Sequence, residues 1–223
     1  MNDPRLQMSS VAQTSVLATN KVLRNTYALL SVTLIFSALM AALSTVLHVG
    51  HGTSLVCSFA ALALIWFVLP RTAESASGIF VVFAFTGLLG FGLGPILNFY
   101  LSMTNGAQAI ATSMGGTAVV FLGLSGYALT TQRDFSFLGG FLFAGLMVVL
   151  LASLAGIFLN MPGLWLAINA AVIMIFSGFI LFDTSRIING GITNYIIATT
   201  SIYLSIYNIF IALLHLLGAA SSD

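Results

Sequence analysis

One acidic side chain is expected inside an apolar helix, where a charge is costly. Asp183 follows the apolar run 173–182 and precedes Thr184, Ser185 and Arg186. Ionisable residues in a membrane commonly face the interior of a helix bundle and carry function. Arg186 lies three residues later on the same helix face, so the two side chains could instead form an ion pair at the helix end. Both interpretations stay open: a structural ion pair, or a titratable group in the bundle interior.

A polar stripe runs along the last apolar segment. Ser201, Ser205 and Asn208 recur at i, i+4 and i+7, and His215 extends the same face by two turns. A helix that faces lipid would not carry such a stripe, so we expect the last helix to lie at the centre of the bundle. The stripe could serve hydrogen bonds between helices or line a hydrated path, and the sequence favours neither.

Signatures of catalysis are missing. The sequence has no nucleophile elbow, no zinc-binding histidine pair with a glutamate, no phosphate-binding loop and no complete dinucleotide fingerprint. His48, His51 and His215 are expected near one membrane face, but no carboxylate or second cysteine joins them to favour a metal site. The single cysteine, Cys57, cannot form a disulfide within the chain. We therefore expect no catalytic activity, no cofactor, no bound metal and, without a basic patch, no nucleic-acid partner.

The composition indicates which elements position these side chains. Of 223 residues, 59% are hydrophobic and 5% are charged, and the mean hydropathy is +1.10. A soluble domain carries about 25% charged residues, so lipid is the expected solvent. Backbone groups in hydrocarbon need internal partners, and the apolar runs lack the alternation of a β-barrel. The sequence predicts an all-α membrane protein with seven transmembrane helices, near 27–47, 54–69, 79–101, 109–130, 138–159, 164–187 and 193–217.

These spans divide the chain into three parts. We expect a polar tail over 1–24, a seven-helix transmembrane domain over 25–218 and a short tail over 219–223. Short loops make consecutive helices antiparallel neighbours in a compact bundle. The second span is expected to be short and to end at Pro70. In the third span Gly94 precedes Pro95, which lacks a backbone donor and clashes with the preceding turn, so a kink is expected there.

The basic residues give the chain an orientation. Three precede the first span, the other three lie in or at the edge of every second loop, and none lies in the alternate loops: Arg5, Lys21, Arg24, Arg71, Arg133 and Arg186. Positive charge in short loops is retained on the cytoplasmic side of a membrane. This pattern predicts a cytoplasmic N-terminus and a periplasmic C-terminus.

Four motifs together resemble those of the Bax inhibitor family of transmembrane proteins. They are GLLGFGLGPIL at 87–97, DFSFL at 134–138, LFDTSRII at 181–188 and SIYLSIYNIF at 201–210, in the order found in the family. The stretch NKVLRNTY at 20–27 and the ending at 208–218 are similar to the bacterial YccA branch, whose members are inner-membrane proteins. The resemblance covers nearly the whole chain.

The resemblance implies six helices surrounding a central seventh, in agreement with the polar stripe. It also implies a pH-sensitive calcium leak, gated in the wider family by two aspartates with an arginine nearby. Asp183 matches the first aspartate, Ser205 stands at the position of the second, and Arg71 lies near that of the arginine. A carboxylate and a hydroxyl cannot titrate as a coupled pair, and calcium prefers more than one carboxylate. The calcium or cation leak is therefore weakened here and remains the alternative.

The YccA branch implies a different activity. Its members interact with the membrane-anchored ATP-dependent protease FtsH and modulate it. Residues 1–20 have few apolar anchors and suit a segment that a protease could grip, although by composition alone they are only a polar tail. We expect a polytopic bacterial inner-membrane protein that binds FtsH and modulates membrane-protein quality control, with the bilayer and FtsH as partners and calcium ions only under the alternative.

Overall fold

The protein is a bundle of long helices joined by short loops. The computed structural model describes the backbone of residues 4–159 and 161–220, and the side chains of residues 19–159, 161 and 163–219. The helices are α1 (Pro4–Val46), α2 (His51–Ala63), a π-helical turn η1 (Leu64–Val68), α3 (Leu69–Thr72), α4 (Ser77–Gly92), α5 (Gly94–Leu101), α6 (Gly106–Thr131), α7 (Leu138–Phe158), α8 (Pro162–Ile188) and α9 (Tyr195–Ala220).

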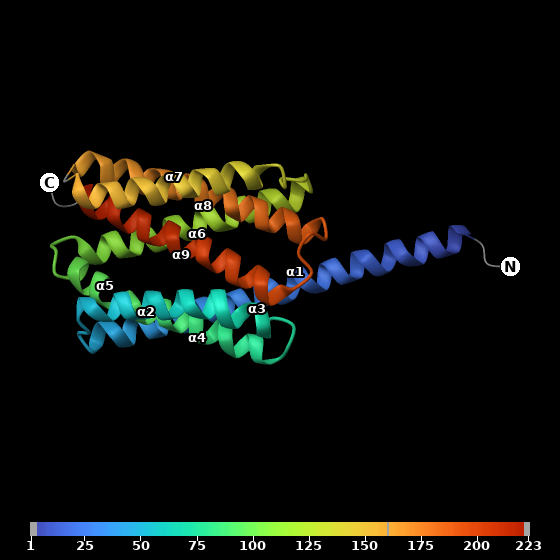
Figure 1. Cartoon of the computed structure of the whole chain (residues 1–223), viewed down its shortest axis with the longest axis horizontal. Coiled ribbons are helices and arrows are strands. Elements are labelled where there is room, and N and C mark those ends of the chain that lie inside the picture. Colours follow the sequence, from blue (N-terminus) through green and yellow to red (C-terminus); the bar gives the residue numbers. More distant parts are fainter. Residues whose placement is uncertain (1–3, 160, 221–223) are drawn as a thin grey trace.

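The described helices form seven segments that are long and apolar enough to cross a membrane, as the sequence predicted. They are Thr19–Val46, His51–Thr72, Ser77–Leu101, Gly106–Thr131, Leu138–Phe158, Gly163–Ile188 and Tyr195–Ala219. Most of their ends agree with the predicted ends within three residues. Within the described side chains the first span is found from Thr19, and α1 itself runs without a break from Pro4 through the predicted boundary at residue 24. Figure 1 shows this N-terminal part of α1 extending beyond the bundle.

The second span is longer than predicted, because it does not end at Pro70. A π-helical turn precedes the proline, and the Leu69 amide closes it by donating to the Leu64 carbonyl. The wider turn shifts the hydrogen-bond register just before the residue that lacks a donor. The helix then continues through Pro70 to Thr72, and the Ala73 amide bonds the Leu69 carbonyl. Proline therefore changes the helix type here without ending the span.

The third span is divided at Leu93, the residue before the Gly94–Pro95 pair. α4 ends at Gly92 and α5 begins at Gly94. A Cβ on Gly94 would collide with the Ser44 side chain of α1. Glycine therefore lets α1 and α5 approach closely at the break. The interruption thus lies where Pro95 removes a donor from the helix ladder.

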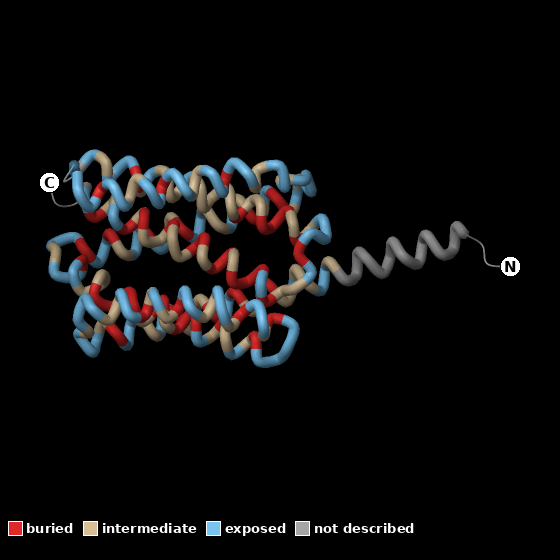
Figure 2. The backbone as a smooth tube through the Cα atoms, in the orientation of Figure 1, coloured by how far each residue is buried: buried red, intermediate tan, exposed pale blue. Residues whose placement is uncertain are grey.

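In Figure 1, α9 crosses the bundle diagonally, between α7 and α8 on one side and α1, α2 and α4 on the other. α9 packs mainly on α1, α4, α6 and α8, whereas α2 packs on α4 and α7 packs on α8. The predicted ring of six helices around the seventh is not confirmed, because α2 and α7 lie outside the helices that contact α9. Figure 2 shows buried residues concentrated along α9 and exposed residues along α7.

Two ends of the bundle can be distinguished by charge. With seven antiparallel spans, Lys21, Arg24, Arg71, Arg133 and Arg186 fall at one end, which we call the basic end. α9 begins at the basic end and ends at the opposite one. The described residues of the loops at that opposite end contain no Lys or Arg.

Candidate functional site: the buried polar end of α8

Asp183 lies on α8 near the basic end and is almost completely buried, with 3% of its surface exposed. The Ser201 hydroxyl of α9 donates a hydrogen bond of 2.5 Å to Asp183 Oδ2. This length is at the short end for a hydroxyl bound to a carboxylate. The α8–α9 loop is short, so the last turns of α8 and the first turns of α9 lie side by side. The structure therefore places the carboxylate against the polar stripe of the last helix.

The two residues after Asp183 are also polar and completely buried. Successive residues on a helix point about 100° apart, so three in a row face three directions. Thr184 Oγ1 lies 3.3 Å from the Ser125 hydroxyl of α6 and 3.5 Å from the Tyr27 hydroxyl of α1. Tyr27 and Ser125 also bond each other at 2.7 Å. Asp183 thus contacts α9, and Thr184 contacts α6 and α1.

Ser185 faces the third direction and holds the loop between α6 and α7. Its hydroxyl donates to the Arg133 carbonyl at 3.0 Å and accepts from the Phe135 amide at 2.8 Å. Asn189 Nδ2 lies 3.2 Å from the same oxygen. Thr184, Ser185, Tyr27 and Ser125 were not predicted as site residues from the sequence. The available signal was the run of three polar residues at the end of an apolar helix.

Replacing Ser185 with alanine should loosen the loop at 132–137 while the bundle stays folded. The substitution removes the acceptor of the Phe135 amide and the donor to the Arg133 carbonyl. Each lost neutral hydrogen bond costs about 1 kcal/mol. Hydrogen exchange should show the Phe135 amide exchanging faster, with the amides of α7 unchanged as an internal control. Unaltered protection at Phe135 would contradict the assigned role.

Ser205, the residue at the position of the second family aspartate, does not bond Asp183. Its hydroxyl donates to the Ser201 carbonyl on its own helix at 3.2 Å. Asn208 likewise donates to the Leu204 carbonyl, at 2.8 Å. Ser201, one turn earlier, makes the contact to the carboxylate. Of the predicted stripe, the structure therefore brings only Ser201 to the acidic residue.

The two candidate arginines bond backbone carbonyls. Arg186 Nη2 donates to the Gly191 carbonyl at 3.2 Å, and its guanidinium lies 5.3 Å from the centre of the Phe182 ring. Arg71 is exposed and donates to the Phe67 carbonyl one turn earlier in its own helix. The Arg186 contact bridges the end of α8 to the loop before α9, and the Arg71 contact stays within its own span. In the described structure the hydrogen-bond partner of the Asp183 carboxylate is a hydroxyl, not a guanidinium.

A second polar junction lies deeper, where α1, α4 and α9 meet. The Tyr203 hydroxyl lies 2.5 Å from the Ser37 hydroxyl and donates to the Thr86 carbonyl at 3.3 Å. The Tyr203 ring packs edge-on against Phe85, with 5.6 Å between centroids. All four residues are buried. This junction fixes three helices with neutral groups, and it was not predicted from the sequence.

The remaining titratable groups do not gather into a metal site. Among the described residues, no three His, Cys, Asp or Glu side chains lie close enough to hold an ion. His215 Nδ1 lies 3.3 Å from Asn169 Oδ1 of α8, and its ring is tilted against Tyr100, with 6.5 Å between centroids. Asp183 is a single carboxylate with a hydroxyl partner.

Asp134, in the loop that Ser185 holds, should titrate below the usual range of an aspartate. Hydrogen bonds from the Ser136 side chain and amide lower the pKa of its carboxyl; the amide lies 2.8 Å from Oδ1. A pKa lower in the folded chain gives a contribution to stability that is present above the unfolded pKa and is lost as pH falls through the folded pKa. NMR titration of Asp134 should show the low pKa, and Ser136→Ala should raise it. A pKa that does not respond to that substitution would contradict this cause.

Comparison with known proteins places the chain in a family. The family described as Inhibitor of apoptosis-promoting Bax1 matches residues 19–222. The chain is 54% identical over 219 residues to the Escherichia coli K12 protein named Modulator of FtsH protease YccA, covering 98% of this chain and 99% of that protein. An E. coli O6:H1 protein named Inner membrane protein YccA matches equally. A Vibrio cholerae protein named Uncharacterized membrane protein is 48% identical over the full length of both chains. The chain therefore belongs to the Bax inhibitor family of membrane proteins.

Proposed function

We propose that this protein is a multi-pass protein of the bacterial inner membrane that binds and modulates the FtsH protease, without catalytic activity of its own. The observation that carries the proposal is the 54% identity, over nearly the full length of both chains, to a relative named as a modulator of that protease. The match covers every span. A modulator needs no active site, and three of the buried polar contacts of this chain join helices: Ser201 to Asp183, Tyr27 to Ser125 and Ser37 to Tyr203.

The alternative, a pH-sensitive calcium or cation leak gated around Asp183, is not favoured. Its gate needs two carboxylates that share a proton, and this chain has Ser205 at the second position. The Asp183 carboxylate accepts from Ser201, and Ser205 bonds its own helix. Calcium takes six to eight oxygen ligands, several of them from carboxylates. A single buried carboxylate gives such an ion little to bind.

Co-purification with FtsH from detergent-solubilised membranes tests the proposal directly. The full-length chain should retain FtsH and should change the rate at which FtsH, in proteoliposomes, degrades a membrane substrate. Deletion of residues 1–20 should weaken retention if this segment contacts the protease, and a chain with these residues in scrambled order is the matched control. Absence of association by the full chain, with an unchanged degradation rate, would reject the proposal.

The proposal includes an orientation, with the basic end in the cytoplasm and α9 ending in the periplasm. It is supported by the position of the cations at one end of the bundle. A cysteine at Ser222, in a chain whose Cys57 is replaced by serine, should react with an impermeant maleimide added to intact spheroplasts. Reaction only after the inner face is exposed would reverse the orientation.

A further inference from the structure

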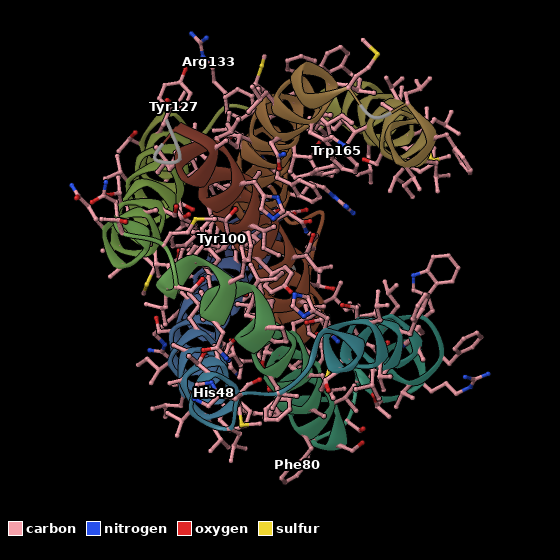
Figure 3. All side chains as sticks on the ribbon, turned by 90° about the vertical axis from the view of Figure 1, so that its left-hand side faces the viewer. His48, Phe80, Tyr100, Tyr127, Arg133 and Trp165 are labelled. Atoms are coloured by element: carbon pink, nitrogen blue, oxygen red, sulfur yellow. The ribbon has the colours of Figure 1, made fainter. Side chains whose placement is uncertain are left out.

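A cavity of about 630 Å³ lies between α1 and α6, in the half of the bundle away from the basic end. At the basic end the two helices meet, because Tyr27 of α1 packs against Phe121 of α6, with 6.0 Å between ring centroids, and bonds Ser125. Further along, both helices pack on α9 and α5. Figure 3, seen from the end where α9 terminates, shows α5 lying between α1 and α6. The cavity is thus closed at its inner end and backed by α9.

The walls of this cavity are uncharged and mostly hydrocarbon. None of the lining residues is Asp, Glu, Lys, Arg or His. Three of the polar groups in the wall are already occupied within the protein: Ser37 bonds Tyr203, Thr45 donates to the Ala41 carbonyl, and Thr117 donates to the Ser113 carbonyl. The Tyr207 hydroxyl also belongs to the lining, but one hydroxyl does not supply the two to four polar partners that a buried water needs. An empty cavity would also forfeit dispersion contacts along its whole lining. The wall therefore selects an uncharged, apolar occupant.

The cavity opens sideways toward lipid. Ala42 of α1, and Met114 and Ala118 of α6, belong to the lining and are also exposed on the surface of the chain. In a membrane-spanning segment that surface faces acyl chains. Small alanines on both helices leave the space that larger side chains would fill. A lipid chain can therefore enter between the two helices without crossing a polar barrier.

The length of the cavity fits one leaflet of the bilayer. Its lining on α1 extends from Leu34 to Val46, and this stretch is about 18 Å long at about 1.5 Å per residue. The hydrocarbon core of a membrane is about 30 Å thick, so one leaflet supplies about 15 Å. The outer limit, at Val46 and Leu101, lies where the first and third spans end, and the inner limit at Leu34 lies near the middle of the first span.

We propose that this cavity binds one acyl chain of a phospholipid from the leaflet on the side where α9 ends. The acyl chain lies along α1 and α6 against α9, with its terminal methyl group near the Tyr27–Phe121 contact. The headgroup of the phospholipid lies at the level of Val46. The lining lacks charge, so recognition is of the hydrocarbon and not of the headgroup. This site is separate from the Asp183 region and does not depend on the proposed action on FtsH.

Photocrosslinking tests this directly. The protein is reconstituted in vesicles of phosphatidylethanolamine and phosphatidylglycerol that contain a phosphatidylethanolamine with a diazirine on its acyl chain, and the labelled peptides are identified by mass spectrometry. The exposed side chains of α7 serve as the ordinary lipid-facing reference. When excess unlabelled lipid lowers the labelling of α7, labelling at 34–46 of α1 and 110–121 of α6 should persist.

Two substitutions that fill the cavity complete the experiment. Ala118→Phe and Ala42→Phe, made singly, place a ring in the opening, and the persistent labelling should then fall to the level of α7. Ala111→Phe, on an exposed alanine of α6 outside the lining, is the matched control and should leave it unchanged. Thermal unfolding identifies any variant that does not fold, so that the other one decides. Labelling that never exceeds that of α7, or that neither filling substitution lowers, would overturn the proposal, as would a non-phospholipid molecule co-purifying in the cavity.

Discussion

Replacing Gly90 with alanine is expected to destabilise the folded bundle by about 3 kcal/mol, at the upper end of the usual cost of overpacking. Gly90 of α4 is buried against Ser37 of α1. An added Cβ would lie 2.6 Å from the Ser37 hydroxyl oxygen and 2.9 Å from its carbonyl carbon, and closer still to its carbonyl oxygen. Because backbone atoms are involved, the two helices must separate. The shift would also stretch the bond between Ser37 and Tyr203 that joins α1 to α9.

Gly126→Ala is the matched control for this prediction. Gly126 lies in α6, and no atom lies within 4 Å of a Cβ built there. Alanine is preferred to glycine in a helix by up to about 1 kcal/mol, so the control should be neutral or slightly stabilising. Unfolding by dodecyl sulfate in mixed micelles, followed by tryptophan fluorescence, measures both variants. Equal stabilities would show that α1 and α4 do not approach as closely as described.

Replacing Ser201 with alanine should cost about 2 kcal/mol, because it leaves the Asp183 carboxylate buried without its donor. The carboxylate is 3% exposed, so water cannot readily replace the hydroxyl. Ser205→Ala is the matched control: it removes a hydroxyl of the same helix that only donates to the Ser201 carbonyl, and should cost less than about 1 kcal/mol. Unfolding in mixed micelles again measures both.

A double variant separates the lost hydrogen bond from other effects of the Ser201 substitution. Adding Asp183→Asn to Ser201→Ala replaces the acid with a neutral group, which costs less to bury without a partner. The double variant should therefore recover part of the stability lost in Ser201→Ala. If Ser201→Ala costs no more than Ser205→Ala, the contact to Asp183 does not stabilise the fold.

The spans could be predicted from the sequence because hydrocarbon demands long apolar helices, and the composition records that demand directly. The seventh span, predicted at 193–217 and found at Tyr195–Ala219, shows how well this works. The passage of the second span through Pro70 could not be predicted, because it depends on a π-helical turn that no residue type specifies. The beginning of α1 was also missed, since a helix continues beyond the membrane without needing apolar residues.

The site was only partly predictable, for a geometric reason. Asp183 stands out because it is an acidic residue in an apolar helix, and the stripe on α9 stands out by its spacing. Which hydroxyl of the stripe reaches the carboxylate depends on the axial position of α9 relative to α8. The spacing of residues within one helix does not give that position. A shift of one turn, about 5 Å, separates Ser201 from Ser205. For the same reason the bond between Tyr27 and Ser125, residues far apart in the chain, left no trace in either local sequence.

The polar triplet at the end of α8 has a mechanical consequence. Asp183, Thr184 and Ser185 engage α9, α6 with α1, and the α6–α7 loop respectively. A rotation of α8 by a single residue, about 100°, would break all of these attachments together. The last turns of α8 are therefore fixed by hydrogen bonds to four neighbouring segments at the basic end, which sets the rotational position of this helix in the bundle.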